Sequence, residues 1–166
     1  MQIAERTCIV KRVSVVSQLS FESVISKFDS LIGHPDMHQF SEKIQSSTSA
    51  EELAGVVHGA VSDAHLMEFL RFDMGDVLKK VFGNYGGKSI RVVMGNPLIM
   101  SSMTIHVPDA GSYAPVTVLI DERADGVHLT YDTMESYLVS YGNEAALEVA
   151  RELDGKVLRV LEEAAE

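Results

Sequence analysis

The chain has 166 residues, of which 46% are hydrophobic and 23% charged, proportions that are ordinary for a folded globular protein and that argue against disorder. Its 24 acidic residues outnumber its 14 basic ones, and the formal net charge is −10. Binding to nucleic acid or to an anionic membrane surface depends on basic side chains, so we expect neither as a partner. No apolar run approaches the roughly 18 residues of a membrane-spanning helix.

The start of the chain is unlike a secretory signal peptide, because an acid and a base, Glu5 and Arg6, precede any apolar stretch. Cys8 is the only cysteine, so no disulfide can form within the chain. Both features are typical of a protein that stays in a reducing cytoplasm, where we expect this one to be. Since there is no repeat or linker, residues 1–166 are expected to form a single domain.

The first half of the chain alternates between strand-like and helix-like patterns. β-branched residues favour the first strand. Ser20 is placed to cap the first helix, and Ser49 with Glu52 forms the reciprocal capping pattern of a later one. The pattern predicts, in order, a strand over 8–17, a helix over 20–33, a helical pair within 34–62, a strand over 66–72 and a short helix from Asp73 to Phe82.

The second half contains the clearest local pattern, a hairpin whose Asp125-Gly126 turn separates two runs of alternating residues. We predict strands over 89–95, 115–123 and 127–133, a short helix over 97–105, and a long helix over 143–164. The long helix has an apolar stripe at spacings of three and four residues: Ala146, Ala150, Leu153, Val157, Val160 and Ala164. Packing on its own sheet and pairing with a second copy explain the stripe equally well, so a homodimer is left open.

Three stretches of the second half, in this order, resemble the family known as domain of unknown function 302: Val92 to Pro97, Ala114 to Val118 and Asp125 to Tyr131. Residues 9–32 match the family's opening strand and helix, whereas residues 34–62 look like a helical insertion. The resemblance implies a TATA-binding-protein-like α+β fold of order β-α-β-β-β-β-α, with a curved antiparallel sheet covered by a long C-terminal helix. It brings no catalytic residues.

One candidate site is a metal or haem site in and after the expected insertion, built from residue types that bind Zn, Cu or haem iron: His34, Met37, His38, His58 and His65. The first three would share one face of a helix, and the last two, seven residues apart, would share another. However, Pro35 disfavours a helical His34. A polar, solvent-facing segment that happens to contain histidines is the interpretation we favour.

A second candidate site surrounds the Asn-Pro turn and consists of Met94, Asn96, Met100 and Met103. Methionines usually fill irregular gaps in a core, and that is the favoured interpretation here. The alternative is a flexible apolar wall of a ligand pocket. Asn96 is expected to bond its own backbone two residues on, as turn asparagines do.

The sequence contains none of the common nucleophile, phosphate-loop or metalloprotease motifs. The one cluster of mixed acid-base types is His128, Tyr131 and Asp132, for which a solvated sheet face is the favoured interpretation. We therefore expect a small binding protein rather than an enzyme, which holds a small apolar or amphipathic molecule, or a protein partner, against its sheet and covering helices. The alternative is a metal- or haem-binding protein; no cofactor is specified.

Overall fold

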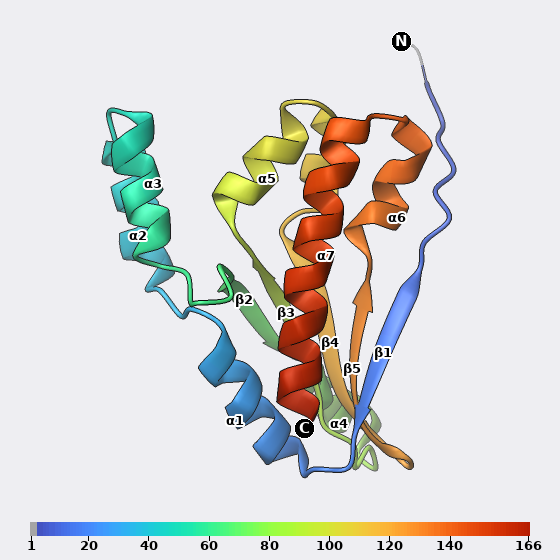
Figure 1. The fold of residues 1–166 in the computed structure, drawn as a ribbon. Coiled ribbons are helices and arrows are strands. Elements are labelled where there is room, and N and C mark those ends of the chain that lie inside the picture. Colours follow the sequence, from blue (N-terminus) through green and yellow to red (C-terminus); the bar gives the residue numbers. More distant parts are fainter. Residues whose placement is uncertain (1–2) are drawn as a thin grey trace.

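The computed structural model describes residues 3–166. Its strands form one antiparallel sheet in the order β1-β5-β4-β3-β2, shown in Figure 1. The strands are β1 (Arg12–Ser17), β2 (Met67–Asp73), β3 (Ser89–Gly95), β4 (Val116–Arg123) and β5 (Gly126–Asp132). This is the α+β arrangement that the sequence predicts.

The helices connect the strands and follow the last of them. They are α1 (Phe21–Leu31), α2 (Met37–Ser46), α3 (Ala50–His58), α4 (Met74–Phe82), α5 (Pro97–Thr104), α6 (Met134–Leu138) and α7 (Glu144–Ala165), with short 3-10 helices η1 (Pro108–Ser112) and η2 (Val139–Tyr141). Three predicted caps are confirmed: Ser20 accepts from the N–H of Ser23, Ser49 from that of Glu52, and Asp73 from that of Asp76. None of the helices within residues 3–166 is both long and apolar enough to cross a membrane.

Helix α7 runs along one face of the sheet, beside α1 (Figure 1). It packs against α1, α5 and α6 and against strands β1 and β5. All members of its predicted stripe are buried inside this one chain: Ala146, Ala150, Leu153, Val157, Val160 and Ala164. The stripe is therefore accounted for without a second copy.

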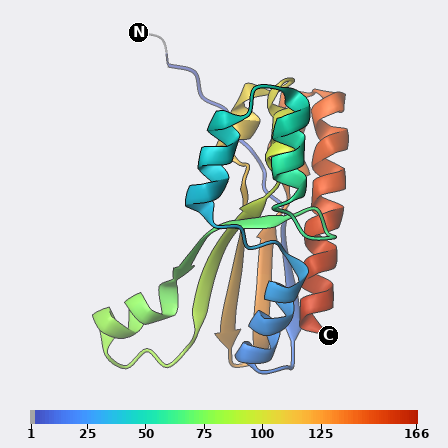
Figure 2. The same ribbon diagram turned by 90° about the vertical axis from the view of Figure 1, so that its left-hand side faces the viewer.

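Helices α2 and α3 lie side by side (Figures 1 and 2) and stand to the left of α7 in Figure 1. Together with Met67 of β2 they enclose a small apolar cluster in which Phe40 and Val57 are also buried. The pair is joined to the sheet at Gly33, whose N–H donates to the Leu66 carbonyl at 2.9 Å and whose carbonyl accepts from Glu68 at 2.8 Å. The helical pair predicted within residues 34–62 is thus present.

One predicted boundary differs from the structure, and one helical stretch was not predicted. The first strand begins at Arg12 rather than at residue 8, because its partner β5 ends at Asp132. Before the strand, the carbonyl of Lys11 still accepts from the N–H of Thr133 at 2.9 Å. Helices α6 and η2, over 134–141, have no counterpart among the predicted elements. They are too short to show a periodic pattern.

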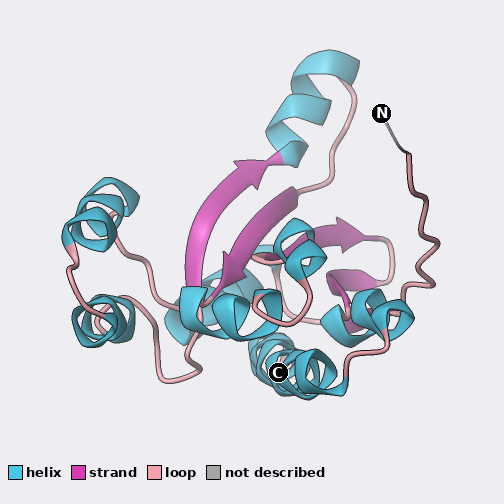
Figure 3. Cartoon of the chain, turned by 90° about the horizontal axis from the view of Figure 1, so that it is seen from above, coloured by secondary structure: helices cyan, strands magenta, loops and turns pink. Residues whose placement is uncertain are grey.

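The face of the sheet opposite α7 is left open. Figure 3 shows the helices gathered mainly on one side of a curved sheet, with the helix that follows β2 extending outward on the other. Apolar side chains on this face stay in contact with solvent, with exposed fractions of 43% for Val16, 60% for Leu70 and 48% for Phe72. An open sheet face with apolar side chains is a candidate binding surface.

Candidate functional site

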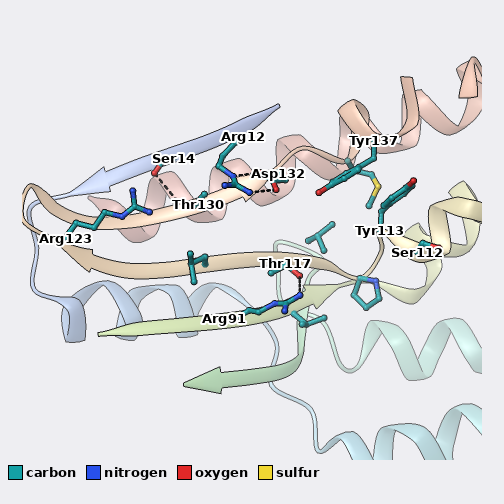
Figure 4. Close-up of a pocket in the computed structure, with 15 residues that line it drawn as sticks. Arg12, Ser14, Arg91, Ser112, Tyr113, Thr117, Arg123, Thr130, Asp132 and Tyr137 are labelled. Atoms are coloured by element: carbon teal, nitrogen blue, oxygen red, sulfur yellow. Dashed lines mark hydrogen bonds and ion pairs between the residues drawn. The ribbon is translucent and has the colours of Figure 1, made fainter. Parts of the chain in front are cut away.

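The open face of the sheet is hollowed into a cavity of about 550 Å³, which we call the trough (Figure 4). Its volume lies within the range of small-molecule sites in proteins, roughly 300–1,000 Å³. Strands β1, β3, β4 and β5 form its floor, and η1 and α6 close one end. The residues that line it include Arg12, Ser14, Arg91, Tyr113, Thr117, Leu119, Arg123, Thr130, Asp132, Met134 and Tyr137.

Two of the three arginines in the trough are held by carboxylates. Arg12 donates to Asp132 from Nε at 2.7 Å and from its terminal nitrogen at 2.8 Å. Arg123 bonds Asp121 in the same bidentate way, at 2.6 and 3.0 Å. The Arg12 guanidinium also holds the pKa of the Asp132 carboxyl below its usual value. In each pair the charge of the guanidinium is balanced by that of the carboxylate, so the two pairs together have a net charge close to zero.

Arg91 differs from the other two. Within residues 3–166 no carboxylate lies at ion-pair distance from it, and its side-chain contact is the hydroxyl of Thr117 at 3.5 Å. Its cross-strand neighbours are Phe72 and Leu119, both apolar. The trough therefore has an excess positive charge placed among apolar side chains, in a chain whose net charge is −10.

An aromatic pair closes one end of the trough. The rings of Tyr113 and Tyr137 stack with their centroids 4.6 Å apart and their planes 13° apart. Tyr137 comes from α6, and Tyr113 directly follows η1. Stacked rings give a rigid, apolar surface at little entropic cost.

A hydrogen-bonded row of polar side chains crosses the β1–β5 edge of the trough. Ser14 Oγ lies 3.2 Å from His128 Nδ1 and 3.1 Å from the hydroxyl of Thr130. His128 Nε2 lies 2.8 Å from the carboxylate of Asp125, and this contact lowers the pKa of Asp125. Serine, imidazole and carboxylate are thus linked in order.

The sequence singled out only one member of this row. His128 was grouped with Tyr131 and Asp132 as mixed acid-base types. In the structure Tyr131 is buried on the opposite face, as strand alternation predicts, and Asp132 pairs with Arg12. Ser14 lies on a strand 114 positions away, so no local spacing reveals it. The Asp-Gly turn that places Asp125 three residues before His128 was the available signal.

The candidate residues around the Asn-Pro turn lie close together, but the cavity between them is very small. Asn96, Met100 and Met103 line a cavity of about 10 Å³, room for roughly one water molecule. Met94 and Met103 are fully buried. The packing matches the favoured interpretation of methionines as core filling.

Asn96 makes its hydrogen bonds within the chain. As predicted, its side-chain oxygen accepts from the N–H two residues on, that of Leu98, at 2.9 Å, and so caps α5. Its amide nitrogen donates to the carbonyl of His65 at 3.0 Å. Both bonds fix the start of α5 against the loop before β2.

The structure does not bring the five candidate metal ligands together. Helix α2 begins at Met37, so His34 stays outside it, as Pro35 favours. The side chain of His38 is 83% exposed beside Glu42. Helix α3 ends at His58, and His65 lies in a loop with a φ of 60°, so these two share no helical face.

His34 nevertheless has two acidic neighbours. In the part of the chain that the structure describes, one group of potential ligands lies close enough to hold a metal ion: Asp29, His34 and Glu68, with ligand atoms within 4.8 Å of one another. The guanidinium of Arg71 bonds both carboxylates, reaching Glu68 at 2.6 Å and Asp29 at 3.2 Å through its second terminal nitrogen. The guanidinium of Arg71 therefore already supplies these carboxylates with the positive charge that a metal ion would bring.

Replacing Arg71 with methionine is expected to lower the free energy of unfolding by about 1–3 kcal/mol, because Asp29 and Glu68 would then face each other without a cation. Urea denaturation measures the loss. Arg159→Met, which removes the same charge from an exposed position on α7, is the control and is expected to change stability by less than about 0.5 kcal/mol. Equal effects of the two substitutions would contradict a structural role for this cluster.

Comparisons with known proteins agree with the fold. The family model described as Domain of unknown function DUF302 matches residues 42–164. The crystal structure of an uncharacterized conserved DUF302 protein from Bacillus stearothermophilus is similar with a TM-score of 0.64 and 9% sequence identity, covering 92% of this chain and 97% of that one. A search of curated proteins found no match.

The limits of the family match differ from those expected from the resemblance. The match begins inside α2 and includes α3, although we expected all of residues 34–62 to lie outside the family pattern. It does not include residues 9–32, which we expected it to cover. The helical pair is thus partly within the pattern of the family.

Proposed function

We propose that this chain, which belongs to the family Domain of unknown function DUF302, binds a small amphipathic anion in the trough. The observation that carries the proposal is Arg91, which projects into the trough without a carboxylate partner in residues 3–166. A guanidinium binds carboxylate, phosphate or sulfate groups through paired hydrogen bonds. The ligand's anionic group takes the place of the missing partner.

The absence of a carboxylate partner for Arg91 within residues 3–166 is notable because the chain as a whole is acidic. Acidic residues outnumber basic ones by 24 to 14, so a guanidinium has many carboxylates with which to pair. Arg12, Arg71, Arg123 and Arg151 are paired in this way. Within residues 3–166, Arg6, Arg91 and Arg159 have no carboxylate at ion-pair distance, and of these three Arg91 is the one that lines the trough. Arg91 instead lies over Thr117, whose hydroxyl offers a second polar contact for an anionic group.

The remainder of the trough suits an apolar group. Val93 and Leu119 form part of its floor, and Met134 lies at the end closed by the tyrosine pair. Burying a short alkyl chain contributes about 0.8 kcal/mol for each CH₂ removed from water. An amphipathic anion therefore satisfies both parts of the surface, as neither an inorganic ion nor a neutral hydrocarbon does.

Isothermal titration with octanoate tests the proposal, with 1-octanol as the neutral analogue of similar length. We expect octanoate to bind more tightly than octanol. Arg91→Gln should weaken octanoate binding at least tenfold, because a hydrogen bond to a charged group contributes about 1.5–3 kcal/mol, and should leave octanol binding unchanged.

Arg159→Gln is the matched control, since it removes the same charge from the exposed side of α7, across the sheet from the trough. It should bind octanoate as the natural chain does. Equal affinity for octanoate and octanol, or equal losses in the two variants, would overturn the proposal.

The alternative, a metal or haem site that uses the histidines between His34 and His65, has less support. Within residues 3–166 only His34 of the five candidates joins a group of potential ligands, and Arg71 holds the carboxylates of that group. Metal analysis and an absorbance spectrum of protein purified without a histidine tag test this alternative directly.

A further inference from the structure

The row Ser14–His128–Asp125 has the connectivity of a nucleophile, a base and an orienting carboxylate. The two contacts of the imidazole, 3.2 Å to Ser14 Oγ and 2.8 Å to Asp125 Oδ1, are within hydrogen-bond distance. His128 presents Nδ1 to the serine and Nε2 to the carboxylate, which is the reverse of the arrangement in chymotrypsin-like enzymes. Such a triad is nevertheless recognised by geometry and roles, which require one ring nitrogen toward the hydroxyl and the other toward the carboxylate.

The hydrogen bonds assign the proton positions. The carboxylate of Asp125 is ionised at neutral pH, since its pKa is lowered by His128, and an ionised carboxylate only accepts. In the neutral imidazole, His128 Nε2 then carries the proton and donates it to this carboxylate, and Nδ1 is the acceptor. Ser14 Oγ–H donates to Nδ1, and the hydroxyl of Thr130 is free to donate to Ser14 Oγ.

Ser14 is the end of the row that faces the trough. Only 7% of His128 is exposed, whereas Ser14 is exposed and lines the trough beside Thr130 (Figure 4). Arg12 lies two residues before Ser14 on the same face of β1, and its guanidinium is paired there with Asp132. A molecule in the trough therefore meets the hydroxyl and not the imidazole.

We propose that Ser14 is a nucleophile toward small carboxylic esters that carry a second, anionic group. The choice of an anionic ester rests on the proposed function, because Arg91 would hold that group. Ser14 Oγ attacks the ester carbonyl carbon while its proton passes to His128 Nδ1. The bond from that carbon to the leaving oxygen then breaks, and the leaving oxygen takes the proton from His128.

The acyl group is then attached to Ser14 and is removed by water. His128 Nδ1 takes a proton from the water as its oxygen attacks the acyl carbon, and returns it to Ser14 Oγ when that bond breaks. Over the two steps the products are the alcohol released first, a carboxylic acid and the regenerated serine, so that atoms and charge balance with water as the co-reactant. Asp125 is a positioning residue that holds the reactive tautomer of His128.

Incubation with mono-4-nitrophenyl glutarate tests the inference, with release of 4-nitrophenolate and peptide mass spectrometry as readouts. In the natural chain the glutaryl group should be found on Ser14, a result that requires no variant. Ser14→Ala should abolish this adduct, and His128→Gln should slow acylation roughly a hundredfold or more. Ser102→Ala, on the exposed side of α5, is the matched control and should react as the natural chain does.

Asp125→Asn separates positioning from structural support. Because the side chain of Asp125 is 71% exposed, its replacement should leave the fold intact. We expect a lower kcat for 4-nitrophenolate release, since the amide favours the wrong tautomer of His128, with KM unchanged. An unchanged kcat, or a loss confined to KM, would contradict the assigned role.

The outcomes distinguish this inference from the proposed function. A glutaryl group on lysine or on His128 alone, or acylation at the same rate in Ser14→Ala, overturns the nucleophile while octanoate binding remains as evidence for the anion site. Acylation of Ser14 by neutral 4-nitrophenyl butyrate as fast as by the glutarate supports the nucleophile and overturns the anionic part. No acylation by either ester overturns the inference entirely.

Discussion

Replacing Asp154 with alanine is expected to lower the free energy of unfolding by about 3–5 kcal/mol. Its carboxylate accepts three hydrogen bonds, from the Tyr131 hydroxyl at 2.6 Å and from the main-chain N–H groups of Met134 at 2.7 Å and Glu135 at 3.0 Å. Alanine leaves these donors without their acceptor, and each buried donor so abandoned costs about 1–3 kcal/mol. Urea denaturation followed by circular dichroism measures the loss.

The Asp154 bonds also connect three elements that shape the site. Asp154 belongs to α7, Tyr131 to β5, and the two N–H groups to the first turn of α6, which carries Tyr137 at the end of the trough. Asp154→Ala should therefore weaken octanoate binding as well. Tyr131→Phe, which removes one donor and keeps the carboxylate, is the graded control and should cost about 1 kcal/mol; an alanine variant no less stable than the phenylalanine variant would contradict this account.

The Asp154 carboxyl also gives a pH dependence of defined sign. Burial raises its pKa above the ordinary value of 3.8, so the folded chain binds this proton more tightly than the unfolded chain does. The contribution of Asp154 to stability is therefore greatest at low pH and declines as the pH rises from the unfolded toward the folded pKa. The control is Asp154→Asn, whose side chain does not titrate. As the pH rises from the unfolded toward the folded pKa of Asp154, the free energy of unfolding of the natural chain should fall relative to that of Asp154→Asn. A rise relative to Asp154→Asn would contradict a raised pKa for Asp154.

Replacing Gly33 with alanine is the second substitution for which we expect a large loss, about 2–4 kcal/mol. A Cβ at this position would overlap the main-chain carbonyl oxygen of Ala60, with the carbonyl carbon of Ala60 and the Cα of Val61 each 3.1 Å away. All three atoms belong to the backbone, so no rotamer change relieves the clash. The loop after α3 would have to move away from β2.

Gly155→Ala provides the control for Gly33→Ala, because it makes the same chemical change in the middle of α7, where a Cβ would meet nothing within 4 Å. It should raise stability by roughly 0.5–1 kcal/mol, since glycine is a poor residue for a helix interior. The two substitutions should therefore differ in sign. A neutral Gly33→Ala would show that the helical pair is not held by this close contact.

The sequence predicts those parts of the fold that neighbouring residues decide. Ser20, Ser49 and Asp73 cap helices because each side chain bonds an N–H three residues on, within reach of local patterns. The Asp125-Gly126 turn is local in the same way, and Gly126 has a φ of 138° that other residues rarely adopt. The stripe of α7 follows from helical spacing alone.

The site depends on strand register, which local patterns do not contain. Ser14 meets Thr130 and Arg12 meets Asp132 because β1 pairs with β5 across more than a hundred residues. The sheet order, with β5 between β1 and β4, decides which polar faces combine. For this reason His128 was recognised as a candidate without its partners, and Arg91 was not singled out.

Nuclear magnetic resonance of the isotope-labelled chain, titrated with octanoate, tests the anion site most directly. We expect saturable amide shifts that cluster on the open face of the sheet, around Ser14, Arg91, Thr117 and Thr130, with little change in α2 and α3. Shifts centred on α2 and α3, or no saturable shifts on the open face, would contradict it.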